Sequence, residues 1–220
     1  MSYLVNRREH VKNPQGWASE FGTDFWFFVN SGSSATAPPG WTMTALSLTA
    51  SGLVGDFHSS ADIDPYFISF GASGDLMQSP IIFGGYDWQQ AQKSILGYAP
   101  TKLCLEVHAQ FTVHSANEPT SGFGFVKATA ATATNHAAFI YTNNANFQLS
   151  DGTSTDAGAA DDALWHIFKI VVDGTNTEWF IDGVSQGTIT TETDEWPVAF
   201  GAHSFTTNRL GISYIHVWAE

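Results

Sequence analysis

The chain has 220 residues and a formal net charge of −13, with 8 basic against 21 acidic side chains. Nucleic acids and anionic membrane surfaces attract clustered Lys and Arg, so this balance excludes both as expected partners. Charged residues make up only 13% and aromatic residues 14%, a composition that suits one neutral, turn-rich all-β domain. No apolar run approaches the roughly 20 residues of a membrane span.

Residues 1–45 are predicted to form an extended N-terminal arm and linker, followed by one sandwich domain at residues 46–220. Three basic side chains lie near the start of this arm: Arg7, Arg8 and Lys12. A solvated terminus explains this cluster, and docking on an acidic partner is the alternative. Residues 2–12 contain no hydrophobic signal core, which favours synthesis in the cytosol; a secreted protein whose signal peptide was removed is the alternative.

An apolar cluster and a long loop follow in the arm. The cluster consists of Phe25, Trp26, Phe27 and Phe28. It is interpreted as an edge of the core, with packing against another subunit as the alternative. Residues 31–40 are rich in Ser, Gly and Pro and are predicted to be a loop, because adjacent prolines fit neither a helix nor a central strand.

Short alternating runs separated by turn residues continue to the end of the chain. They predict strands at 45–53, 66–70, 80–83, 103–113, 122–128, 137–141, 146–149, 165–172, 178–181, 184–189, 198–202 and 210–217. One short helix is predicted at 86–94. About a dozen strands at this spacing indicate a sandwich or jelly roll. Cys104 lies in an apolar strand and is predicted to be a buried small hydrophobe.

The clearest local pattern is a pair of strands at 165–172 and 178–181. Apolar and polar positions alternate through both, and Asp-Gly pairs close each of them at 173–174 and 182–183. Asp-Gly tolerates the positive φ angles that tight hairpin turns need. The segment is therefore predicted to be a β-hairpin.

Trp165-His166, followed by Phe-Ile-Asp-Gly at 180–183, resembles the pattern near the C-terminal end of concanavalin A-like domains, which include laminin G-like, pentraxin-like and glucanase-like sandwiches. The last strand, 212–218, is similar to the final strand of that family. The resemblance covers about residues 75–220 and implies an all-β antiparallel β-sandwich, a concanavalin A-like jelly roll. That fold hosts both glycan binders and glycan hydrolases, so function must be argued from sites.

A hydrolase of this fold carries two carboxylates on one strand face, about 5 Å apart in a retaining enzyme. The nearest match is residues 192–195, where the compressed spacing points Glu192 and Glu195 to opposite faces. It also follows the turn at 182–183, whereas the resembling hydrolases carry their catalytic strand before it. The chain is therefore predicted not to be an enzyme, and a diverged glycan hydrolase is the weakest hypothesis.

The 8 histidines form no zinc-binding pattern and are predicted to be strand-face or capping residues. Calcium is the better candidate, because four aspartates share a predicted loop at 150–162: Asp151, Asp156, Asp161 and Asp162. Their spacing matches no calcium motif, which favours a solvated acidic loop. The prediction is no cofactor, with Ca²⁺ as the alternative.

Glycan binding needs exposed aromatic rings together with amide groups. The candidates in or near predicted loops are Trp41, Tyr86, Trp88, Asn143, Asn144, Asn146 and Trp196. The tryptophans at 165, 179 and 218 are assigned to packing in or between the sheets instead.

Lectin-like sandwiches of cellular origin usually carry an export signal, and its absence here favours a virus or phage particle. The first hypothesis is a non-enzymatic virion surface protein, such as a capsid decoration, head-fibre or tail-associated subunit. Its partners would be other virion proteins, further copies of itself in a homo-oligomer, with a trimer expected by analogy, and host-surface glycans. The alternative is a carbohydrate-binding lectin, with or without Ca²⁺.

Overall fold

The computed structural model describes residues 21–26, 42–44, 68–70, 75–78, 101–111, 121–126, 136–143, 146–190, 199–204 and 210–219. Within these ranges every regular element is a strand: β1 Phe21–Trp26, β2 Thr42–Thr44, β3 Ile68–Phe70, β4 Asp75–Gln78, β5 Leu103–Phe111, β6 Ser121–Val126, β7 His136–Asn143, β8 Asn146–Ser150, β9 Thr155–Ala160, β10 Trp165–Val172, β11 Asn176–Ile181, β12 Val184–Thr190, β13 Ala199–Ser204 and β14 Leu210–Ala219. None of the described elements is a helix that could cross a membrane.

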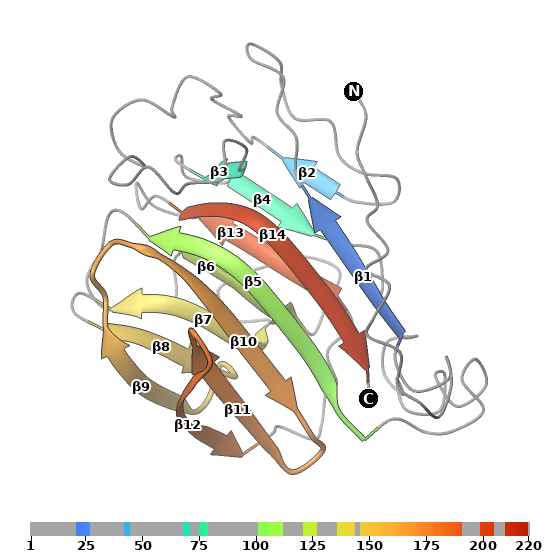
Figure 1. Ribbon diagram of the computed structural model, residues 1–220, viewed down its shortest axis with the longest axis vertical. Coiled ribbons are helices and arrows are strands. Elements are labelled where there is room, and N and C mark those ends of the chain that lie inside the picture. The colour runs from blue at the N-terminus through green and yellow to red at the C-terminus, as the bar shows by residue number, and fades with distance from the viewer. Residues whose placement is uncertain are drawn as a thin grey trace.

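The strands form two seven-stranded antiparallel sheets that face each other (Figure 1). The first sheet has the order β1-β14-β5-β10-β11-β12, with β3 also paired to β14. The second has the order β2-β4-β13-β6-β7-β8-β9. This architecture confirms the all-β sandwich with a jelly-roll arrangement. The helix expected at 86–94 and the strands expected at 45–53 and 80–83 lie outside the described residues.

The core lies between the sheets because alternate positions of each central strand point inward. On β5, Leu105 and Val107 face Ile170 and Phe168 of β10 across the ladder, and all four are buried. This face of β5 therefore points into the core. Cys104 is buried too, as expected.

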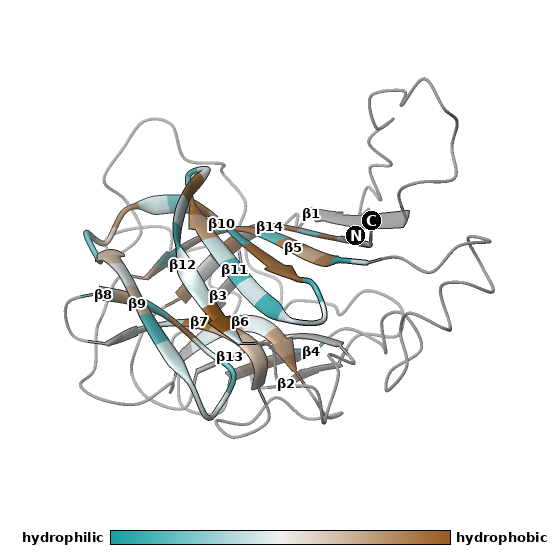
Figure 2. Ribbon diagram, turned by 90° about the horizontal axis from the view of Figure 1, so that it is seen from below, coloured by the Kyte–Doolittle hydropathy of each residue, from teal (hydrophilic) through white to brown (hydrophobic). Residues whose placement is uncertain are grey.

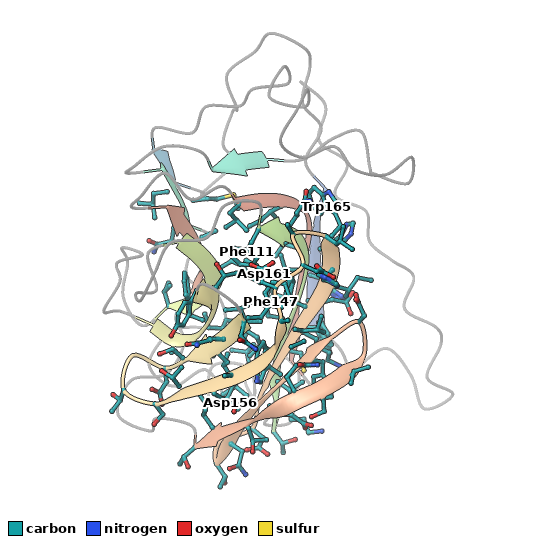
Figure 3. All side chains as sticks on the ribbon, turned by 90° about the vertical axis from the view of Figure 1, so that its left-hand side faces the viewer. Phe111, Phe147, Asp156, Asp161 and Trp165 are labelled. Atoms are coloured by element: carbon teal, nitrogen blue, oxygen red, sulfur yellow. The ribbon has the colours of Figure 1, made fainter. Side chains whose placement is uncertain are left out.

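Aromatic rings fill the middle of the core. The ring of Phe168 packs edge-on against Phe147 at 5.1 Å and Phe123 at 5.5 Å between centroids. Phe111 lies beside them, and Figure 3 shows Phe111 and Phe147 in the space between the two sheets. Such buried edge-to-face contacts add to the free energy of area burial.

The hairpin at β10, β11 and β12 forms as predicted from the sequence. Asp182 and Gly183 have φ angles of 51° and 81°, and Ile181 pairs directly with Val184. Positive φ at both central residues defines a type I′ turn, whose twist matches that of the flanking strands. β10 has the predicted bounds, and β11 and β12 agree with prediction within two residues.

β9 differs from expectation, because the sequence at 150–162 was predicted to be a loop. Thr155–Ala160 instead pairs with β8 at the edge of the second sheet, beside β12 of the first; in Figure 2 the colour of this strand ranges from teal through white to light brown. Its residues are small and mostly exposed, so they carry no apolar alternation that would reveal a strand. Tertiary hydrogen bonds hold it, including one from Asn146 Nδ2 to the Gly158 carbonyl oxygen at 2.9 Å.

Two strands lie within residues 1–45, the expected arm. β1 pairs with β14 along its whole length, which joins residues 21–26 to the first sheet. β2 pairs with β4 in the second sheet. Arg7, Arg8, Lys12, Phe27 and Phe28 lie outside the described residues, and the division of the chain near residue 45 stays a prediction.

Candidate functional site

The four aspartates of the acidic segment each accept hydrogen bonds within the fold. Asp151 is buried, and its Oδ1 accepts the N–H groups of Thr153 and Ser154 in a tight turn. Oδ2 of Asp156, on β9, accepts the indole N–H of Trp179 at 2.9 Å.

Asp161 and Asp162 cap the connection that follows β9. Oδ1 of Asp161 accepts the Ala163 N–H at 2.9 Å, and Oδ1 of Asp162 accepts the Leu164 N–H at 2.9 Å. Among the residues that the structure describes, no group of three His, Cys, Asp or Glu side chains is placed to hold a metal ion. The prediction of no cofactor, with Ca²⁺ as the alternative, stays a prediction.

His166 lies between two carboxylates at one end of the sandwich. Its Nε2 is 2.8 Å from Oδ1 of Asp162, and its Nδ1 is 2.6 Å from Oδ2 of Asp182. The other oxygen of Asp182 accepts the Ile167 N–H at 2.9 Å. Both ring nitrogens donate only in the protonated imidazolium, so the cation fits this arrangement best. We call Asp162, His166 and Asp182 the histidine clasp.

The clasp explains why Trp-His and Asp-Gly occur together in the sequence. The turn between β11 and β12 folds back on the start of β10, where the Asp182 N–H donates to the Ile167 carbonyl oxygen at 2.8 Å. His166 also packs on Phe147 of the second sheet, with 5.5 Å between ring centroids. The clasp therefore ties the hairpin, the β9–β10 connection and the second sheet together, which agrees with the predicted role of this histidine on a strand face.

Burial lowers the pKa of His166, but the hydrogen bonds and negative charges of Asp182 and Asp162 outweigh it and raise the net pKa. Burial raises the pKa of Asp162, but the hydrogen bonds from His166 and the Leu164 N–H bring the net pKa below its usual range. The contribution of His166 to stability is therefore lost as pH rises through its folded pKa. That of Asp162 is lost as pH falls through its own folded pKa.

Replacing Asp182 with asparagine should lower the pKa of His166, because the amide removes a negative charge and the opposing effect of burial remains. Long-range ¹H–¹⁵N NMR spectra recorded against pH measure this pKa directly. Asp173→Asn is the matched control, since Asp173 also precedes a glycine in a turn but bonds only to N–H groups of its own turn. An unchanged pKa in the Asp182 variant would contradict the clasp.

A second arrangement lies on the face of the second sheet opposite the core, where two half-buried amide side chains meet a tyrosine that is only 6% exposed. On β8, Phe147 and Leu149 enter the core, so Asn146 and Gln148 point outward. Gln148 lies opposite Tyr141 of β7, whose hydroxyl donates to Gln148 Oε1 at 2.7 Å. We call Tyr141, Asn146 and Gln148 the amide face.

Hydrogen bonding within the described residues orients both amides of this face through one atom of each. Asn146 donates its Nδ2 to Gly158, and Gln148 accepts with its Oε1. Asn146 Oδ1 and Gln148 Nε2 make no hydrogen bond within the described part of the chain. Burial raises the pKa of Tyr141 and a hydrogen bond with Thr155 partly lowers it, so at neutral pH the phenol is protonated and donates.

The structure brings together only some of the residues that the sequence predicted to bind glycan. Asn146 is on the amide face, and Asn143, at the end of β7, is its cross-strand partner. Trp41, Tyr86, Trp88, Asn144 and Trp196 lie outside the described residues. Tyr141 and Gln148 are not among the predicted residues, because glycan-binding side chains were expected in or near loops and these two lie on strands. The alternation Asn-Phe-Gln-Leu on β8 is the signal that points to Gln148.

The three tryptophans that the sequence assigned to packing differ in how deeply they are buried. Trp179 is fully buried in the core. Trp218 is 7% exposed and stacks on His216 at 4.4 Å between centroids. Trp165 is half-buried at the start of β10, 5.0 Å from the ring of His108.

No family model and no curated protein matches the chain. Among solved structures, a conserved carbohydrate esterase of the Shiga toxin-encoding bacteriophage phi24B is similar over 82% of this chain and 90% of that one, with 12% identity and a TM-score of 0.53. The Crh5 transglycosylase has 10% identity over 90% and 83% of the two chains and a TM-score of 0.46. The Emp47p carbohydrate recognition domain has 10% identity over 84% and 91%, with a TM-score of 0.45.

These neighbours include both enzymes and a recognition domain, at identities that carry no inference about activity. Only the phage esterase among them has a TM-score above 0.5. The chain therefore has the jelly-roll β-sandwich fold seen in that phage protein.

Proposed function

We propose that this chain is a non-enzymatic carbohydrate-binding sandwich whose amide face holds the sugar. The observation that carries this proposal is a pair of amide atoms on β8 that bond to no other described residue: a donor on Gln148 and an acceptor on Asn146. Alternate residues of a strand are about 7 Å apart, a separation that hydroxyl groups of one or two adjacent sugar rings can bridge. Tyr141 fixes the orientation of Gln148, so little side-chain entropy is lost on binding.

Binding without turnover fits the chemistry of this face. Glycoside hydrolysis needs a pair of carboxyl groups beside the sugar. The described side chains of the amide face are a phenol and two amides, which recognise hydroxyl groups but cannot serve as that pair. The similarity to a phage carbohydrate esterase supports carbohydrate as the ligand class.

The test is a glycan array with the full chain, followed by calorimetric titration of the best ligand. Gln148→Ala should weaken binding about tenfold, the effect of losing one well-placed hydrogen bond of about 1.4 kcal/mol. Tyr141→Phe should weaken it less, because the amide loses its orientation but not its donor. Ser185→Ala, which removes an exposed hydrogen bond to Glu178 on the first sheet, is the control and should leave binding unchanged.

Two results would contradict the proposal: no glycan bound by the wild-type chain, or equal affinities for the wild type and the Gln148 variant. Release of new reducing ends from a bound polysaccharide would contradict the non-enzymatic part. Repeating the titration with EDTA tests whether binding requires Ca²⁺.

We further propose that the sandwich is displayed on a virus particle as a surface subunit, with the part of residues 1–45 that precedes β1 as its attachment arm. Support comes from the arm's basic side chains and from the shared fold with a phage protein. Antibodies against the sandwich should label the surface of purified particles in electron micrographs. Particles that lack the chain would contradict this role.

A further inference from the structure

The large hydrophobic side chains that are exposed in the described part of the chain gather around the histidine clasp. Leu164 is 47% exposed, Ile167 46% and Val184 64%. Leu164 lies between Asp162 and His166 in the chain, Ile167 bonds to Asp182, and Val184 follows the same turn. Exposed apolar residues that cluster at one place commonly mark a contact with another molecule.

The charge at this place is negative. The side chains of Asp162 and Asp182 are 46% and 53% exposed, whereas that of His166 is 15% exposed. The two carboxylates thus present their charge outward while sharing one imidazolium. We call Asp162, Leu164, Ile167, Asp182 and Val184 the clasp surface. A partner that is complementary to this surface combines basic side chains with apolar ones.

The chain itself contains such a segment. Residues 3–12 read Tyr-Leu-Val-Asn-Arg-Arg-Glu-His-Val-Lys, which combines apolar residues with Arg7, Arg8 and Lys12 in a chain of net charge −13. We propose that the clasp surface binds the N-terminal segment, residues 3–12, of a second copy of this chain. This inference rests on the proposed role of the residues before β1 as an attachment arm, and it names where that arm binds.

The register of the first sheet places the start of β1 far from the clasp surface. The registers of β1 with β14, of β14 with β5 and of β5 with β10 align Phe21, the first residue of β1, with Val172 of β10. Val172 is five residues from Ile167 along β10, a distance of about 17 Å. β1 and β11 are also four strands apart, or about 19 Å, and Figure 1 shows β1 at the edge opposite β12. A chain's own segment would have to cross the sheet diagonally, whereas a neighbour's segment has no such constraint.

Charge exchange between two double variants of the full chain tests this contact. The arm variant is R7E with R8E, and the surface variant is L164K with V184K. Thr188→Lys with Thr190→Lys is the matched control, because it adds the same charges at exposed positions of β12 away from the clasp. Sedimentation velocity measures self-association over a range of protein concentrations and salt.

The wild type should self-associate, less strongly at high salt. Each double variant should weaken association at least about tenfold, and the control should change it less than about twofold. Mixing the arm and surface variants should restore association, because the glutamates of one then meet the lysines of the other. Unchanged glycan affinity in all three variants shows that they are folded and separates this test from that of the proposed function.

Three results would overturn the inference. The first is a wild-type chain that remains monomeric at about 100 μM. The second is a mixture of the arm and surface variants that associates no better than either variant alone. That result would fit an arm that docks on its own molecule, because mixing two variants cannot restore a contact within one chain. The third is a control variant that weakens association as much as the surface variant. If the double surface variant does not fold, L164K alone gives the same comparison.

Discussion

Replacing Trp179 with alanine should lower the free energy of unfolding by about 3–5 kcal/mol, the usual range for removing a large buried aromatic ring. Trp179 is 0% exposed in the core, and its indole N–H donates to Asp156 of β9 at 2.9 Å. The ring also lies against Gly158, where an added Cβ would be 2.6 Å from it. The substitution removes both core volume and one of the hydrogen bonds between β9 and the first sheet. Urea unfolding measures the change.

The matched control for this substitution is Phe180→Ala. Phe180 is the next residue of β11, points to the opposite face and is only half-buried. Its loss should cost clearly less than that of Trp179. Equal costs for the two variants would contradict the assignment of Trp179 as a core residue that helps to join the two sheets.

Replacing Gly124 with alanine should have the second large effect on stability, about 3 kcal/mol. A Cβ at this position would be 2.1 Å from the carbonyl oxygen of Ala138 and 2.7 Å from Cα of Phe139, both backbone atoms of β7. Neither atom can rotate away, so β6 and β7 would have to separate. The φ angle of 158° at Gly124 is also rare for residues with a side chain. The midpoint of thermal unfolding reports the loss.

Gly183→Ala separates the steric effect at Gly124 from the backbone effect. Gly183 has a φ angle of 81°, but a Cβ there would meet nothing within 4 Å. This control should therefore cost only the strain of the left-handed conformation, about 1–2 kcal/mol. If the Gly124 variant were as stable as this control, the close approach of β7 to β6 would be wrong.

The sequence predicted the central strands well because their side chains alternate between core and outer face. β10 is the clearest case, since Phe168, Ile170 and Val172 all enter the core and an Asp-Gly turn follows. β9 could not be predicted in this way, because its small residues bury little and are held by partners distant in sequence. β4, at 75–78, was missed for a similar reason: it is short, and its position depends on pairing with β13 and β2.

The candidate site was predictable only in part. Asn146 was found because it follows a turn rich in asparagine, but its partners across the ladder depend on the register of β7 with β8. Tyr141 looked like one more strand residue, and nothing local shows that its hydroxyl meets Gln148. The clasp at His166 likewise needs Asp182, 16 residues away, to fold back through the hairpin.

We propose that carbohydrate binds on the outer face of β7 and β8. The most direct test is to titrate the best array ligand into ¹⁵N-labelled protein and follow the backbone amide signals. We expect the largest shifts at Tyr141, Asn146 and Gln148, with the histidine clasp unaffected. Shifts confined to other strands, or to the clasp, would contradict it.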